Sequence, residues 1–136
     1  DSVVARLLAV ARSAADVRVV ELKRKDSLEL TDADRALIAD VVRAAPEERI
    51  VITHGTDTMT DTAKALAGIE GKTIVLVGAL APARFGESDA SFNLGMAFAT
   101  AQVAEPGVYI TMSGSVFRAD QVVKDRAKGA FVSIPT

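Results

Sequence analysis

The side chains best suited to chemistry gather in one short segment, residues 53–62. It holds five threonine hydroxyls around a glycine and an aspartate: Thr53, Thr56, Thr58, Thr60 and Thr62 around Gly55 and Asp57. In one interpretation they are structural, because Thr and Asp cap helices and glycine makes tight turns. In the other, Thr56 lies between a strand and a helix N-terminus, where its hydroxyl and nearby N–H groups can meet an anionic or oxyanionic group. Asp57 could then hold an amine or orient a base, and the residues alone leave both interpretations open.

A threonine hydroxyl is a weak nucleophile until a neighbouring group removes its proton. Because the chain has a single histidine, a lysine or a water is the more plausible base. Lys124 is a candidate, since it stands beside the carboxylate of Asp125 and burial disfavours the charged form of a lysine. The alternative is a solvated surface lysine, which is the usual state of this residue type.

Two further residues invite a functional interpretation. His54 follows a predicted buried strand, where a histidine can act as a general base. We favour a structural role for it, in which the ring fixes the loop by hydrogen bonding. Arg84, in the polar segment 84–89, could grip a carboxylate as part of a lid, but a solvated loop is the commoner outcome for such a segment.

Helix and strand patterns alternate around these residues. Residues 31–44 predict a helix, because Thr31 can cap it, two aspartates occupy its first turn, and an apolar stripe follows. Apolar runs predict strands at 17–22, 50–52, 73–77 and 108–112. Further helices are predicted at 3–14, at 57–67 and around 92–98, and 78–89 is predicted to be a loop.

This alternation predicts a single α/β domain built on a doubly wound, mostly parallel sheet, Rossmann-like or flavodoxin-like, with helices on both faces and right-handed crossovers. In such sheets, ligands bind beyond the carboxyl ends of the strands. The site is therefore expected in the loops after Leu22, Ile52, Val77 and Met112.

The composition excludes several classes of protein. A chain of 136 residues, about half of them hydrophobic, suffices for one core, and a net charge of -2 without a basic tail argues against a nucleic-acid partner. The absence of cysteine excludes disulfides and thiolate chemistry, and one histidine makes a His-rich metal site implausible. No apolar run approaches the roughly 18 residues that cross a bilayer. We therefore expect no membrane partner and a cytoplasmic location.

Several strings match a family pattern. Residues 51–59, VITHGTDTM, closely resemble the second signature of bacterial-type L-asparaginases and their glutaminase and amidotransferase relatives. The resemblance continues through residues 74–79, 92–94 and 123–124 and covers most of the chain. Residues 24–35 are similar to those of a small, single-domain asparaginase-like group.

The resemblance implies an amidohydrolase that converts the side-chain amide of L-asparagine, or of L-glutamine, to the acid and ammonia through a threonine nucleophile. It implies three catalytic residues, a threonine, its acidic neighbour and an activating lysine: Thr56, Asp57 and Lys124. It implies that Ser27 binds the substrate α-carboxylate and that Asp57 contacts the α-amino group. The other implied substrate contacts are Thr56, Gly55 and Ala79. The resemblance also implies no metal or organic cofactor, and a homodimer or homotetramer.

The chain also departs from the family pattern. It contains no Thr-Gly-Gly-Thr segment, which in the family carries the acyl-accepting threonine, and Leu28 stands where many members have a polar substrate ligand. We therefore expect residues 1–136 to form an N-terminal-type domain that lacks its first strand and that loop, without a C-terminal domain. The alternative function is a non-catalytic module that binds asparagine or aspartate. A nucleotide-binding domain is disfavoured, because no Gly-x-Gly-x-x-Gly or Walker-type string follows a predicted strand.

Overall fold

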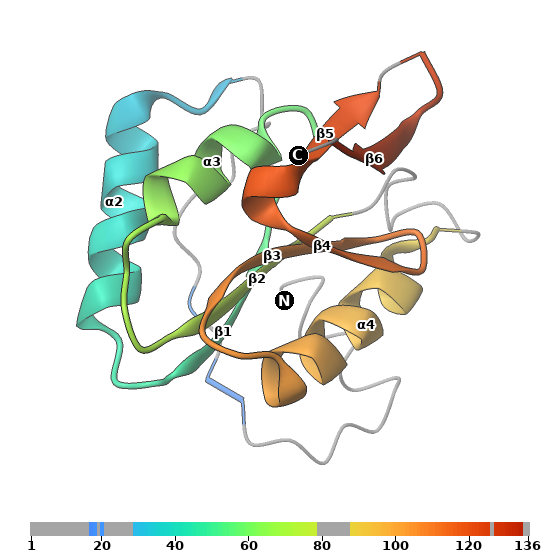
Figure 1. The fold of residues 1–136 in the computed structure, drawn as a ribbon. Helices are drawn as coiled ribbons and strands as arrows, with labels where there is room; N and C mark the ends of the chain where they lie inside the picture. Colours follow the sequence, from blue (N-terminus) through green and yellow to red (C-terminus); the bar gives the residue numbers. More distant parts are fainter. Residues whose placement is uncertain (1–16, 19, 21–28, 79–87, 126, 135–136) are drawn as a thin grey trace.

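The structure is a computed structural model of the chain, and it describes residues 17–18, 20, 29–78, 88–125 and 127–134. Figure 1 shows its elements, which in chain order are α2 (Asp32–Ala44), β1 (Arg49–Thr53), α3 (Met59–Leu66), β2 (Thr73–Val77), α4 (Ala90–Val103), β3 (Gly107–Met112), β4 (Ser115–Arg118), η2 (Ala119–Gln121), β5 (Val122–Asp125) and β6 (Ala130–Ser133). The predicted helix at 3–14 lies outside these residues. Within the predicted strand at 17–22, Val17, Arg18 and Val20 are not in a strand, and the rest lie outside the described residues.

Helix α2 confirms the helix predicted from its capping pattern. The Thr31 hydroxyl oxygen accepts the N–H of Asp34 at 3.2 Å, and the Asp34 carboxylate accepts the N–H of Thr31 at 2.9 Å. This reciprocal capping box satisfies two backbone donors that would otherwise lack a helical partner. No helix in the described ranges has the length and apolar character needed to cross a membrane.

The main sheet has the order β1-β2-β3-β4. Strands β1, β2 and β3 run parallel, and β4 pairs antiparallel with β3. The register places Thr53 beside Val77, and Val77 beside Thr111, so the carboxyl ends of the three parallel strands lie at one edge. The predicted strands at 50–52, 73–77 and 108–112 are confirmed, and the sheet is mostly parallel as expected.

Three strands were not predicted. Residues 115–118 form β4, and residues 122–125 and 130–133 form the hairpin of β5 and β6, which is a separate two-stranded sheet. These strands have four residues each. A strand of that length shows too few alternations to stand out in a sequence, and its stability comes from its partner and from packing.

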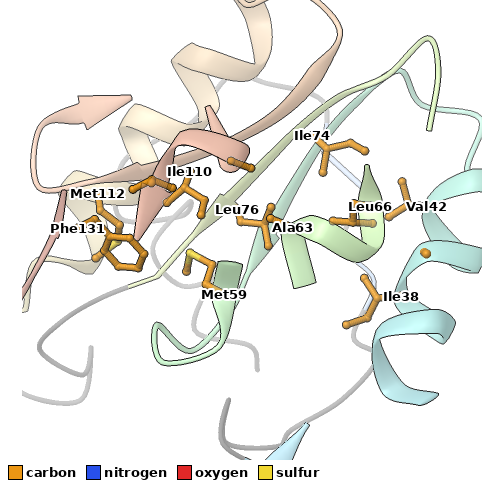
Figure 2. Packing of buried hydrophobic residues seen from close by; sticks show 13 residues of the cluster. Ile38, Val42, Met59, Ala63, Leu66, Ile74, Leu76, Ile110, Met112 and Phe131 are labelled. Carbon is orange, nitrogen blue, oxygen red and sulfur yellow. The ribbon is translucent and has the colours of Figure 1, made fainter. Parts of the chain in front are cut away.

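Both faces of the sheet are covered, as predicted. On one face, α2 and α3 pack against the side chains of Ile74 and Leu76 in β2 and of Ile110 and Met112 in β3 (Figure 2). On the other face, α4 packs against side chains that alternate with these: Val75, Val77 and Tyr109. All five residues of β2 are buried, which agrees with its central place in the sheet.

The prediction that every crossover is right-handed is wrong. The strands β1, β2 and β3 follow one another in order across the sheet, while α3 lies on one face and α4 on the other. Two successive crossovers that step in the same direction and use opposite faces have opposite hands, so one of them is left-handed. The physical cause is that β2 is buried on both faces. Because the strands follow one another in order, α3 and α4 can cover opposite faces only if one crossover is right-handed and the other left-handed.

Candidate functional site

The candidate site lies in the loop between β1 and α3, at the carboxyl ends of the parallel strands. The N–H of His54 donates to the carbonyl of Val77 at 2.9 Å, which extends the β1–β2 ladder by one residue. The chain then turns, and α3 begins at Met59 rather than at Asp57, where the sequence predicted it. Thr58 is the N-cap residue of α3 but makes no side-chain capping bond. Capping by Thr58 therefore does not account for the polar side chains of this loop.

Lys124 joins the two polar residues at the centre of this loop. Its Nζ donates to the Thr56 hydroxyl oxygen and to the Asp57 Oδ1, both at 2.7 Å. The Lys124 side chain is 16% exposed and that of Asp57 is 33% exposed, so the cluster lies at the surface without being fully solvated. Partial burial strengthens both contacts relative to a solvent-exposed ion pair. The arrangement places the Lys124 nitrogen within proton-transfer distance of the Thr56 hydroxyl, beside a carboxylate that can stabilise a positive charge.

The hairpin of β5 and β6 positions Lys124. In an antiparallel pair, Lys124 lies directly opposite Phe131, and both share one hairpin face with Val122. Val122 and Phe131 are buried in the core cluster that contains Met59 and Met112. Figure 2 shows Phe131 in this cluster. Burying each of these two side chains stabilises the hairpin by roughly 1.5–3 kcal/mol. These two apolar residues thus anchor the hairpin beside α3. Lys124, on the same hairpin face, is thereby directed toward the loop after β1.

Gly78 allows the loop after β1 to lie close to the end of β2. A Cβ atom at this position would lie 2.5 Å from the His54 carbonyl oxygen, 3.0 Å from Cγ2 of Thr56 and 3.1 Å from Cε of Met59. Only glycine fits at these distances. Gly78 had no predicted role, although a glycine directly after a buried strand is a usable signal of close backbone approach.

His54 makes two hydrogen bonds that fix the loop after β1. Its Nδ1 contacts the carbonyl oxygen of Gly55, and its Nε2 lies 2.6 Å from the hydroxyl oxygen of Thr62. Because a carbonyl oxygen only accepts, Nδ1 carries the proton and Nε2 accepts from Thr62. Burial, with a smaller effect from the nearby charge of Arg35, lowers the pKa of His54 below its ordinary value, while the bond to Gly55 opposes this. The contacts agree with the structural role that the sequence suggested.

Asn93 is a second residue at this edge of the sheet for which no function was predicted. It lies on α4 with no exposed surface and hydrogen-bonds to the segments that follow β2 and β3. The available signal in the sequence was an amide side chain between two apolar neighbours, Phe92 and Leu94, which indicates a buried polar residue. Buried polar side chains with several partners are usually there to fix a geometry.

The remaining sequence-predicted residues are distributed as follows. Gly55 lies exposed in the loop between His54 and Thr56, and its carbonyl faces the His54 ring. Ser27, Leu28, Ala79 and Arg84 lie outside the described residues. Thr56, Asp57 and Lys124, which the sequence predicted as one catalytic set, are brought into direct contact.

Comparison with known proteins identifies the class of protein that this fold and site define. The family model of the asparaginase N-terminal domain matches residues 2–135, so the chain belongs to the asparaginase family. It is 34% identical over 119 residues to a glutaminase-asparaginase of Acinetobacter glutaminasificans; the match spans 81% of this chain and 36% of that protein.

Two solved structures share the fold. The thermostable L-asparaginase from Thermococcus kodakarensis superimposes with a TM-score of 0.84 at 29% identity, over 95% of this chain and 42% of that one. A probable cytoplasmic L-asparaginase from Campylobacter jejuni gives a TM-score of 0.84 at 30% identity, over 96% of this chain and 44% of the other. The chain therefore spans less than half the length of these relatives.

Proposed function

We propose that this protein hydrolyses the side-chain amide of a small amino acid, L-asparagine first and L-glutamine second, to the acid and ammonia. The observation that carries the proposal is the contact of Lys124 Nζ with both the Thr56 hydroxyl and the Asp57 carboxylate at 2.7 Å. The names of the relatives, an L-asparaginase and a glutaminase-asparaginase, support the substrate class.

In the proposed reaction, the neutral amine of Lys124 takes the proton of the Thr56 hydroxyl as its oxygen attacks the carboxamide carbon. The resulting ammonium of Lys124 is stabilised by Asp57 and returns the proton to the departing nitrogen as the C–N bond breaks. Ammonia leaves, and an ester joins the acyl group to Thr56. Water then hydrolyses the ester with the same proton transfers, which releases the acid and restores the hydroxyl.

Substrate binding is assigned to four residues: Asp57, Ser27, Gly55 and Ala79. Asp57 holds the α-ammonium of the substrate by resemblance to the family, and its side chain is one-third exposed. Ser27 binds the α-carboxylate, and Gly55 and Ala79 complete the contacts, by resemblance to the family. We also propose a homo-oligomer in the cytoplasm, which the description of the Campylobacter jejuni relative supports for location. No metal or organic cofactor takes part in the proposed steps.

The test is ammonia release from asparagine and glutamine by the intact protein and by Thr56→Ala and Lys124→Met. Loss of a general base lowers the rate on the order of 10²–10⁴-fold, and loss of the attacking hydroxyl should lower it at least as much. Lys128→Met is the matched control, because Lys128 is exposed in the turn of the same hairpin. Unchanged turnover in both site variants would contradict the proposal. Binding of aspartate without turnover of either amide would favour the non-catalytic module instead.

A second experiment locates the attacking oxygen. Rapid acid quenching during turnover, followed by peptide mass spectrometry, identifies the residue that carries the acyl group. An adduct on the peptide containing Thr56 supports direct attack by this residue. An adduct on another threonine would assign the attack to that residue and leave Thr56 and Lys124 as the proton-transfer pair.

A further inference from the structure

Asn93 connects three segments at the edge of the sheet that carries the candidate site. Its Nδ2 donates to the carbonyl of Gly78 at 3.1 Å and to the Asp89 carboxylate at 3.0 Å, and its Oδ1 accepts the N–H of Ser113 at 2.9 Å. Both amide hydrogens and the amide oxygen are thus used, and the residue has no exposed surface. A single side chain therefore joins the end of β2, the end of β3 and the start of α4.

The bond to Ser113 lies in a tight turn with positive φ at both residues. Ser113 has φ 55 and Gly114 has φ 85, in the two-residue connection between β3 and β4. Positive φ at both positions is typical of a type I′ turn, and it is unfavourable for a residue with a Cβ. Capture of the Ser113 N–H by Asn93 offsets part of that cost and fixes the end of β3 relative to α4.

The bond to Gly78 reaches the candidate catalytic pair. Gly78 lies against Thr56 and His54 so closely that a Cβ at position 78 would come within 3.0 Å of the Thr56 methyl carbon. The methyl and hydroxyl of Thr56 are attached to the same Cβ, so the surface that receives the methyl also sets the direction of the hydroxyl. That hydroxyl is 2.7 Å from Lys124. The contacts form a continuous path from Asn93 through Gly78 to Thr56.

We propose that Asn93 is a positioning residue, which holds Gly78 in place so that the Thr56 hydroxyl stays aligned with Lys124. The proposal rests on the proposed function for its catalytic consequence, and on the hydrogen bonds alone for its structural part. Small displacements of a reacting group are costly: a shift of about 1 Å can reduce the rate about 100-fold.

The decisive variant is Asn93→Asp, which keeps the size and one acceptor oxygen but removes both donated bonds and puts a second carboxylate against Asp89. Thr100→Val is the matched control. Thr100 is buried on the same helix, and its hydroxyl donates to the Met96 carbonyl within α4, away from the site loops. Both variants are measured as the intact protein, at a temperature where circular dichroism shows each to be folded.

Two readouts decide the matter. For ammonia release from asparagine, we expect Asn93→Asp to lower kcat at least about tenfold with KM changed by less than about threefold, and Thr100→Val to keep kcat within about twofold. For amide hydrogen exchange, we expect the amide of Ser113 and those of residues 54–57 to exchange faster in Asn93→Asp only. Asn93→Ala provides a second test of the exchange pattern if Asn93→Asp does not fold.

The outcomes distinguish failure of the proposed amide hydrolysis from failure of the positioning role of Asn93. If the parent protein releases no ammonia, the proposed function fails, and the exchange pattern still decides whether Asn93 holds the loop. Equal losses of kcat in Asn93→Asp and Thr100→Val would overturn the positioning role, because they would reflect general destabilisation of α4. Unchanged exchange at residues 54–57 in a folded Asn93 variant would overturn it as well.

Discussion

The amine of Lys124 lies 2.7 Å from the hydroxyl oxygen of Thr56, although 68 positions separate the two residues in the sequence. The two come from different sheets: Thr56 follows β1 of the main sheet, and Lys124 belongs to β5 of the hairpin. Packing of Val122 and Phe131 into the core brings the hairpin to the loop. The contact between Lys124 and Thr56 thus depends on an apolar anchor elsewhere in the same hairpin.

The first prediction concerns the coupling of this pair. If Lys124 activates Thr56, the double variant Thr56→Ala/Lys124→Met should be no slower than the slower single variant, because residues that act as a unit are not additive. The measurement is kcat/KM for ammonia release in the full double-mutant cycle. Lys124→Arg keeps hydrogen-bond donors at this position but cannot lose a proton at working pH, and it should be as inactive as Lys124→Met. Additive losses would show that the two residues act independently.

The second prediction concerns Gly78. The methyl group of Gly78→Ala would lie 2.5 Å from the His54 carbonyl oxygen, so the backbone must shift, at a cost of about 1–3 kcal/mol in the free energy of unfolding. We expect amide turnover to fall as well, since the same shift moves Thr56.

The control for that variant is Gly95→Ala. Gly95 lies within α4, and a Cβ there would meet nothing within 4 Å. Alanine in a helix interior should therefore stabilise the protein by about 0.5–1 kcal/mol. Urea unfolding of Gly78→Ala and Gly95→Ala measures the free energy of unfolding of both variants. A Gly78→Ala protein as stable and active as the parent would contradict the close approach.

The third prediction concerns the pH dependence of stability. Burial lowers the folded-state pKa of His54, the single histidine of the chain, below its ordinary value of 6.5. The unfolded chain then binds a proton at a higher pH than the folded one, so stability from this residue is complete above pH 6.5 and declines as the pH falls through that value.

The variant His54→Gln removes this titration. Urea unfolding at several values between pH 8 and pH 5 should show a smaller loss of stability towards acid for His54→Gln than for the parent. Because the carboxylates titrate in both proteins, the difference between the two curves isolates the histidine. Parallel curves would rule out a lowered His54 pKa.

The fourth prediction separates stability from activity. Thr31→Ala removes the side-chain cap of α2 and should cost about 1 kcal/mol in the free energy of unfolding. Thr31→Ser keeps the hydroxyl and should recover most of that loss. Thermal unfolding measures both. Turnover per folded molecule should stay constant in both variants, because the cap lies at the start of α2 and the candidate site follows β1; a fall in kcat would tie α2 to the site.

The sequence predicted those elements whose signals are local. Patterns within about 15 residues predicted three features: the cap of α2, the apolar runs of β1, β2 and β3, and the helices on both faces. The hairpin did not, because strands of four residues acquire their stability from Phe131 and Val122 in the core rather than from their own sequence. The opposite hands of the two crossovers were also missed, since they follow from how β2 is covered on each face.

Thus the sequence by itself determined the chemistry available: a threonine and an aspartate in a loop at the end of a buried strand, and a lysine that could serve them. Tertiary structure alone decided that the lysine reaches them, that Gly78 leaves room for Thr56, and that Asn93 spans the ends of β2 and β3. The physical reason is that each of these contacts joins residues far apart in the chain. Their distances depend on how separate elements pack, which no local pattern of residues encodes.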